Sequence, residues 1–215
     1  AILGAQATNG IQNSEAMSLT NEGTLVTLGD YSPTIFVQSI GGGGGWTGAV
    51  NGKAKLGSIN STDVTQQNSA DINVVSNGAA LTTSGTNSAG IAVQSTAGGG
   101  GWVGSVGNEL TMGARSGEGE MNAGSINVVN SSLVKTFGET SPGISIQSIG
   151  GGGGYAGSVG GNAQFGSSNN TGSQSAGNIT LQNSGAVVST GAFSPLINVQ
   201  SIGGGGGRAG DIGGD

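Results

Sequence analysis

The sequence predicts an all-β fold, a parallel β-solenoid of about four repeats with about 53 residues each. The first of two observations is a sequence motif in which Gln and Ser precede a run of glycines. It occurs four times, and its glutamines, Gln38, Gln94, Gln147 and Gln200, are 56, 53 and 53 residues apart. The second observation is that apolar and polar residues alternate at the same sites of every repeat. A fixed period of this size is typical of stacked repeats, and alternation with a period of two is typical of strands.

Three short alternating segments in each repeat are expected to be strands. In the third repeat these segments are residues 126–128, 133–134 and 144–146. Neighbouring side chains of a strand point to opposite faces. We therefore expect Ile126 and Ile144 to point into a core, and Asn127 and Ser145 to point toward solvent.

The number of coils in each repeat can be interpreted in two ways. We favour two coils of about 27 residues, one rich in Val and Ile and the other in Gly, because only short apolar segments follow the glycine runs. The alternative is one large coil, in which each glycine run lies against the next and the rings of Trp46, Trp102 and Tyr155 are able to stack. Arg208 takes the place of the aromatic residue in the fourth repeat. The repeat units of this one continuous solenoid are residues 1–50, 51–106, 107–159 and 160–215.

The glycine runs also allow two interpretations. Consecutive glycines lose much conformational entropy when they become ordered, which favours a flexible linker. However, the runs are similar in length and follow an apolar strand, and in three repeats an aromatic residue comes directly after them. Because glycine lets neighbouring backbones approach closely, we expect the runs to form ordered ladders.

Composition argues against several classes of function. The chain has 215 residues and a formal net charge of −6, with only five basic residues. Nucleic-acid binding depends on clustered Lys and Arg, so we expect no nucleic-acid partner. The sequence has no Cys and no His, which are the usual zinc ligands. No apolar run is long enough for a transmembrane helix.

Clustered carboxylates are rare in the sequence. Of eleven acidic residues, only Glu118 and Glu120 form a close pair that breaks the repeat pattern, in a glycine-rich loop that the other repeats lack. We interpret this loop as a solvated surface feature. We therefore predict no enzymatic activity, no metal and no cofactor.

Residues 124–131 and 141–154 resemble the glycine-rich repeats in passenger regions of bacterial autotransporter proteins, the surface and secreted products of Gram-negative bacteria. The resemblance rests on the motif Ser-Pro-Gly-Ile, followed by Gln-Ser-Ile and a run of glycines. It covers all four repeats. Thr96-Ala97 in place of Ile-Gly, and Arg208 in place of an aromatic residue, depart from this pattern. The resemblance implies a β-solenoid stalk or adhesin exported to the cell surface.

Two functions follow as hypotheses. The first is a structural protein of the extracellular space or bacterial cell surface: a stalk, an adhesive fibre or a filament segment. Its partners would be neighbouring repeats or further copies of itself joined end to end, because both ends of the sequence lie within the repeat pattern. The chain would then be an interior piece of a longer protein or a processed product. The alternative is a carbohydrate-binding or carbohydrate-cleaving solenoid, with surface or matrix carbohydrate as partner and the rings of Trp46, Trp102 and Tyr155 as stacking platforms.

Overall fold

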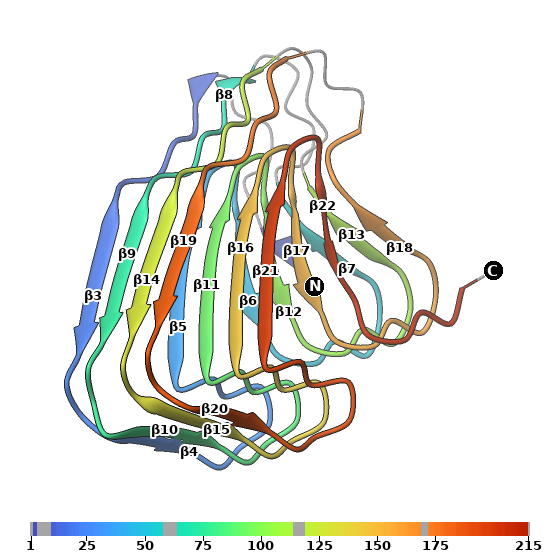
Figure 1. The fold of residues 1–215 in the computed structure, drawn as a ribbon. Helices are drawn as coiled ribbons and strands as arrows, with labels where there is room; N and C mark the ends of the chain where they lie inside the picture. Colours follow the sequence, from blue (N-terminus) through green and yellow to red (C-terminus); the bar gives the residue numbers. More distant parts are fainter. Residues whose placement is uncertain (1, 4–9, 58–63, 114–118, 169–171, 215) are drawn as a thin grey trace.

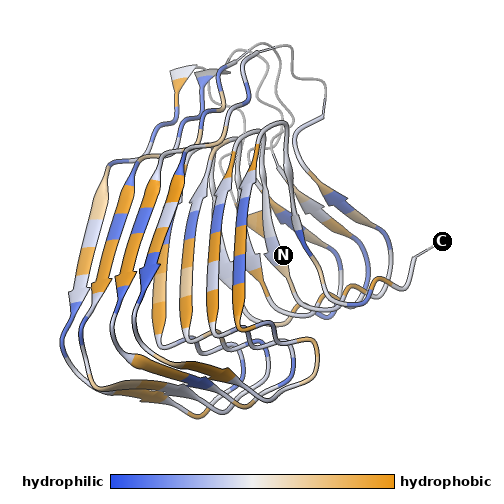
Figure 2. Cartoon of the chain, in the orientation of Figure 1, coloured by the Kyte–Doolittle hydropathy of each residue, from blue (hydrophilic) through white to orange (hydrophobic). Residues whose placement is uncertain are grey.

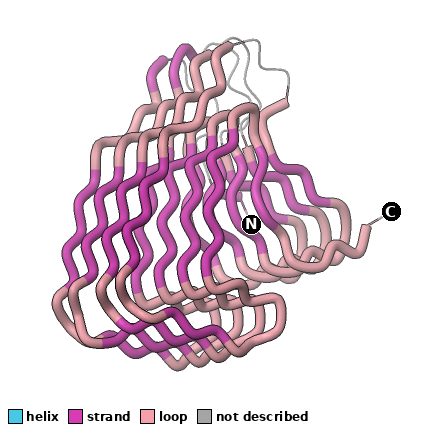
Figure 3. The backbone as a smooth tube through the Cα atoms, viewed as in Figure 1, coloured by secondary structure: helices cyan, strands magenta, loops and turns pink. Residues whose placement is uncertain are grey.

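The computed structural model describes residues 2–3, 10–57, 64–113, 119–168 and 172–214. These residues form a parallel β-solenoid without any helix, which confirms the predicted fold class (Figures 1 and 3). The chain passes through four coils, and each strand pairs in parallel with the equivalent strand of the coil before or after it. Sheets of parallel strands that stack by repetition are typical of solenoids.

Three four-stranded sheets enclose the first part of each coil, and we name them by their place in Figure 1. The outer sheet contains β3 (Met17–Asn21), β9 (Ile72–Ser76), β14 (Ile126–Asn130) and β19 (Ile179–Asn183). The floor sheet contains β4 (Leu25–Thr27), β10 (Ala80–Thr83), β15 (Leu133–Thr136) and β20 (Val187–Ser189). The central sheet contains β5 (Ile35–Ile40), β11 (Ile91–Thr96), β16 (Ile144–Ile149) and β21 (Ile197–Ile202).

The remaining strands form two more four-stranded sheets and a strand pair. The glycine sheet contains β6 (Gly44–Thr47), β12 (Gly100–Val103), β17 (Gly153–Ala156) and β22 (Gly206–Arg208). The flank sheet contains β1 (Ile2–Leu3), β7 (Ala54–Leu56), β13 (Leu110–Met112) and β18 (Ala163–Phe165). The strand pair consists of β2 (Gly10–Ile11) and β8 (Val64–Gln66).

Each repeat forms one large coil, so the preference for two coils of about 27 residues was wrong. Gln94 pairs with Gln38 on one side and with Gln147 on the other, so that one repeat along the sequence is one step along the solenoid. The segments after the glycines do not close a coil of their own. They form the flank sheet, which pairs only with the flank strands of neighbouring coils.

The coil is large enough to hold two apolar cores. The first core lies between the outer, floor and central sheets and consists of Val, Ile and Leu side chains, including Val74, Leu81 and Ile144. The second includes Leu56, with its equivalents in the flank sheet, and small apolar residues that follow the glycine runs. Figure 2 shows apolar and polar residues alternating along the strands of the outer and central sheets. This alternation directs the apolar side chains of the outer sheet inward.

Both faces of the central sheet are buried in the two inner coils, where every residue of β11 and β16 is buried. Ile144 packs in the first core, as predicted. Ser145 lies on the opposite face but is only 1% exposed, so the prediction that it points to solvent was wrong. The reason is that this face packs against the glycine sheet: Ala92, which pairs with Ser145, clusters with Trp102 and Tyr155.

Candidate functional site

The residues that recur in every repeat meet where the central sheet packs on the glycine sheet. We call this contact the axial seam. It contains the glutamine column Gln38, Gln94, Gln147 and Gln200 and the column Trp46, Trp102, Tyr155 and Arg208. The two columns lie close together, since the Nε2 of Gln94 donates a hydrogen bond to the carbonyl oxygen of Gly101 at 3.4 Å.

The glutamine side chains form a continuous hydrogen-bonded ladder along the solenoid. Gln38 donates from Nε2 to the Oε1 of Gln94 at 2.5 Å, Gln94 donates to Gln147 at 2.6 Å, and Gln147 donates to Gln200 at 2.7 Å. Gln94 and Gln147 are buried, and each accepts a hydrogen bond at Oε1 from the preceding glutamine and donates one from Nε2 to the following glutamine. Because a buried amide is costly when it lacks partners, the ladder stabilises only an arrangement in which the coils are in register.

The column Trp46, Trp102, Tyr155 and Arg208 contains one stacked pair of rings and ends in a cation. The rings of Trp102 and Tyr155 are stacked, with centroids 3.9 Å apart and an angle of 21° between their planes, and the ring of Phe36 meets Trp102 edge-on. In the fourth coil, the guanidinium of Arg208 lies over the Tyr155 ring at 5.9 Å. Arg208 therefore replaces an aromatic ring with a cation that binds the face of the preceding ring.

Burial raises the pKa of the Tyr155 phenol above its ordinary value of 10.0, and this effect outweighs the opposing charge of Arg208. The folded chain therefore retains the phenol proton at a pH where the unfolded chain has already lost it. The resulting stability is fully present below pH 10 and is lost as the pH rises above it.

Substitution of Tyr155 by Phe should remove the contribution of this phenol to alkaline unfolding. At neutral pH we expect Tyr155→Phe to lose about 1 kcal/mol, because the hydroxyl donates a 2.9 Å hydrogen bond to the carbonyl oxygen of Thr140. Urea unfolding between pH 7 and pH 11 measures both effects. Tyr31→Phe, at a half-buried tyrosine, is the matched control and should retain the alkaline loss of stability. An equal alkaline loss in Tyr155→Phe would contradict the assignment.

The glycine runs are ordered ladders, as predicted. In the second run every glycine has a positive φ, 80° and 81° at Gly98 and Gly99 and 135° at Gly100 and Gly101. The amide of Gly100 donates to the carbonyl oxygen of Gly43 at 3.2 Å, which connects two coils. The runs therefore serve as backbone contacts between coils.

Serine side chains after the glutamines connect the central sheet to the segment that leads into the outer sheet. Ser95 donates from Oγ to the carbonyl oxygen of Ala70 at 3.0 Å and accepts a hydrogen bond from the amide of Gly124, also at 3.0 Å. Ser148 repeats both contacts one coil further along, with Gly124 and Gly177. Each hydroxyl thus joins its own coil to the next one.

A second glutamine column was missed by sequence reasoning. Gln12, Gln67, Met121 and Gln174 occupy equivalent places in the four coils, as the backbone hydrogen bonds show. Gln67 donates from Nε2 to the Oε1 of Gln12 at 3.3 Å. Its own Oε1 is buried without a partner, because the neighbouring coil supplies Met121. The spacing of Gln12, Gln67 and Gln174 was a signal for this column, but Met121 interrupts it.

Replacing Met121 by Gln should complete this second ladder and stabilise the chain by about 1 kcal/mol. The new Nε2 would donate to the Oε1 of Gln67, and its Oε1 would face Gln174. Thermal unfolding should show a melting temperature higher by about 2–4 °C. Met121→Leu, which keeps the apolar volume but offers no donor, is the control and should not stabilise. A melting temperature of Met121→Gln at or below that of Met121→Leu would refute the prediction.

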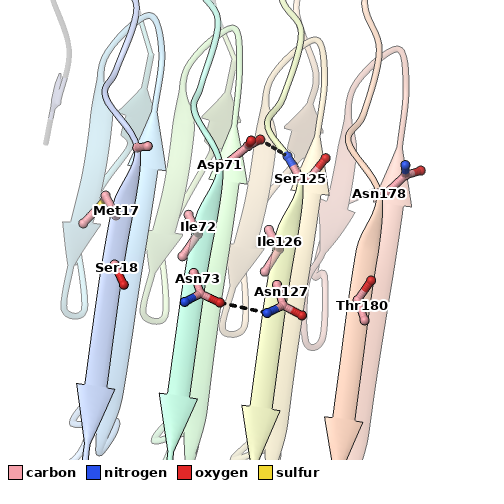
Figure 4. Close-up of a pocket in the computed structure, with 11 residues that line it drawn as sticks. Met17, Ser18, Asp71, Ile72, Asn73, Ser125, Ile126, Asn127, Asn178 and Thr180 are labelled. Atoms are coloured by element: carbon pink, nitrogen blue, oxygen red, sulfur yellow. Dashed lines mark hydrogen bonds between the residues drawn. The ribbon is translucent and has the colours of Figure 1, made fainter.

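A shallow groove of about 570 Å³ crosses the outer sheet (Figure 4). Within it, Asn127 donates from Nδ2 to the Oδ1 of Asn73 at 2.8 Å, and the amide of Ser125 donates to a carboxylate oxygen of Asp71 at 2.7 Å. Both hydrogen bonds run from one coil to the next, so these polar groups also connect coils.

Charged groups form no cluster in the described part of the chain. Glu118 lies outside the described residues, and Glu120 forms an isolated bridge with Gln66 through the backbone. Lys53 and Glu109 form an exposed ion pair of 2.7 Å. Over the described ranges, no group of three or more acidic residues is placed to hold a metal ion, and no helix is long and apolar enough to cross a membrane.

Comparisons of the chain with protein-family models, with curated protein sequences and with solved structures found no significant match.

Proposed function

We propose that this chain is a structural, non-enzymatic segment of an extracellular or bacterial cell-surface protein, in which the solenoid forms part of a stalk or filament. The observation that supports this role is that the recurring residues bond one coil to the next. The glutamine ladder and the serine contacts both run along the solenoid axis. Such a structure gains length by adding coils, about 4.8 Å at a time, without any change in its contacts.

The aromatic rings of the inner coils favour this role over carbohydrate binding. Trp102 is 0% exposed and Tyr155 is 1% exposed, so a sugar ring has no access to their faces. Both rings instead pack in the axial seam with Ala89 and Ala92. The two rings therefore serve as packing between the central and glycine sheets, which a structural solenoid needs.

Immunogold labelling of the source cells tests the proposal. Antibodies raised against the purified chain should label intact cells on the outside or label material shed from them. An antibody against a cytosolic protein is the control, since it should label only permeabilised cells. If the chain too is labelled only after permeabilisation, a surface role is wrong.

A further inference from the structure

The outward face of the floor sheet, at the lower side of the solenoid in Figure 1, carries exposed side chains. In strand β15 the side chains of Val134 and Thr136 are buried, whereas Lys135 between them is half-buried on the outside. Phe137, directly after the strand, is 49% exposed. Because β10 and β20 pair with β15 on its two sides, this exposure is a property of the side of the solenoid and not of its ends.

Four side chains of this face, all from the two inner coils, lie next to one another. Thr82 pairs with Lys135 across β10 and β15. The same register places Ser84 beside Phe137, because the amide of Phe137 donates to the carbonyl oxygen of Thr83 at 3.1 Å. Positions two residues apart on a strand are separated by about 7 Å, and neighbouring strands by about 4.8 Å. Thr82, Ser84, Lys135 and Phe137, which we call the floor patch, therefore cover an area close to that of one sugar ring.

The polar groups of the floor patch do not connect the coils. In the described part of the chain, the hydroxyls of Thr82 and Ser84 and the ammonium group of Lys135 have no hydrogen-bond or ion-pair partner. On the outer sheet, by contrast, Asn127 donates to Asn73 of the preceding coil. The three polar groups of the floor patch are therefore available to another molecule.

The chemistry of the floor patch fits a sugar that carries a carboxylate. The one charge in the patch is the cation of Lys135, which forms a charge-assisted hydrogen bond with an anionic group. The ring of Phe137 offers an apolar surface to the C–H face of a sugar ring. The hydroxyls of Thr82 and Ser84 both donate and accept hydrogen bonds, as sugar hydroxyls require.

Two other classes of anionic partner fit the floor patch less well. An acidic peptide that binds by adding a strand needs an open sheet edge, but β10 and β15 are paired on both sides. An anionic membrane surface attracts clusters of basic residues. Among the described residues of the floor strands, Lys135 is the single basic residue.

We propose that the floor patch binds a glycan that contains uronic acids, with a sugar carboxylate on Lys135 and the sugar ring on Phe137. In the reverse orientation, the carboxylate would face Glu139, an exposed acid in the turn after Phe137. This inference rests on the proposed surface function and names a partner for it. The site lies outside the axial seam, where the rings of Trp102 and Tyr155 are closed to a sugar.

Depletion of the purified chain from solution by polysaccharide-coated beads tests the proposal. Beads that carry polygalacturonate or alginate, two polymers of uronic acids, should bind the chain. The methyl ester of polygalacturonate is the matched control, because it keeps the sugar ring but lacks the negative charge, and it should bind much less. Equal binding to the methyl ester, or no binding to either polymer of uronic acids, would overturn the proposal. Equal binding to polyglutamate beads or to phosphatidylglycerol vesicles would also overturn it, because the patch would then recognise charge alone.

Substitutions in the floor patch locate the binding site. Lys135→Gln should raise the dissociation constant for polygalacturonate at least about 5-fold, and Phe137→Ala should raise it about 2- to 12-fold. Lys55→Gln, at an exposed cation of the flank sheet, is the control and should leave it unchanged. Circular dichroism should show that all three variants keep the fold. If Lys55→Gln weakens binding as much as Lys135→Gln does, the floor patch is not the site.

The surface function and the glycan site can fail separately. Surface labelling without binding to either polymer of uronic acids would retain the structural function and reject the site. Binding that depends on Lys135, without surface labelling, would retain the site and reject the surface function.

Discussion

Substitution of Gly100 by Ala should destabilise the solenoid by about 3–5 kcal/mol. A Cβ atom at this position would lie 1.9 Å from the carbonyl oxygen of Gly153 in the next coil. Because that oxygen belongs to the backbone, it can move only if two coils separate. The φ of Gly100 is also 135°, a conformation that residues with a Cβ rarely adopt. Urea unfolding followed by circular dichroism measures the loss.

Gly52→Ala is the matched control for this prediction. No atom lies within 4 Å of a Cβ placed at Gly52, and its backbone is outside the left-handed region. We expect the free energy of unfolding of this variant to change by less than about 0.5 kcal/mol, as for other exposed surface positions. If Gly52→Ala and Gly100→Ala lose similar amounts of unfolding free energy, the close approach of the coils does not depend on glycine at position 100.

The strands and their repetition could be predicted from the sequence because local patterns determine them. Alternation around Ile126 and Ile144 predicted the first core, and the similar length of the glycine runs, with their apolar and aromatic neighbours, predicted ordered ladders. The size of the coil could not be predicted in this way. A repeat of one or two coils has the same sequence period, and the difference lies in which strands pair. In the structure, each glycine strand pairs with glycine strands of the neighbouring coils, and each Val- and Ile-rich strand pairs with its own equivalents.

Two features, one in the axial seam and one in the second glutamine column, depend on contacts that the local sequence does not show. Ser145 was predicted to face solvent because a small polar residue between Ile144 and Ile146 is typical of an exposed position. The glycine sheet that covers it comes from a segment with no alternating pattern to predict a sheet. Similarly, the buried oxygen of Gln67 follows from Met121 in the next coil, which the sequence around Gln67 does not show.

A carboxylate on either face of the central sheet should destabilise the chain strongly. We expect Ile144→Asp and Ser145→Asp each to cost at least about 3 kcal/mol at pH 7, because both residues are fully or almost fully buried and a carboxylate there loses its hydration. Asn127→Asp is the control: Asn127 is exposed, and we expect its replacement to cost less than about 1 kcal/mol.

The dependence on pH identifies the cause of the loss in the two buried variants. Burial should raise the pKa of each new carboxyl above its unfolded value of about 3.9. The folded chain then binds a proton that the unfolded chain has lost, so the stability of the variant falls as the pH rises above about 4. Urea unfolding at pH 4 and pH 7 should show a smaller loss relative to the parent chain at pH 4 for both variants. If Ser145→Asp behaves like Asn127→Asp at both pH values, the second face of the central sheet is open to water and the axial seam is wrongly placed.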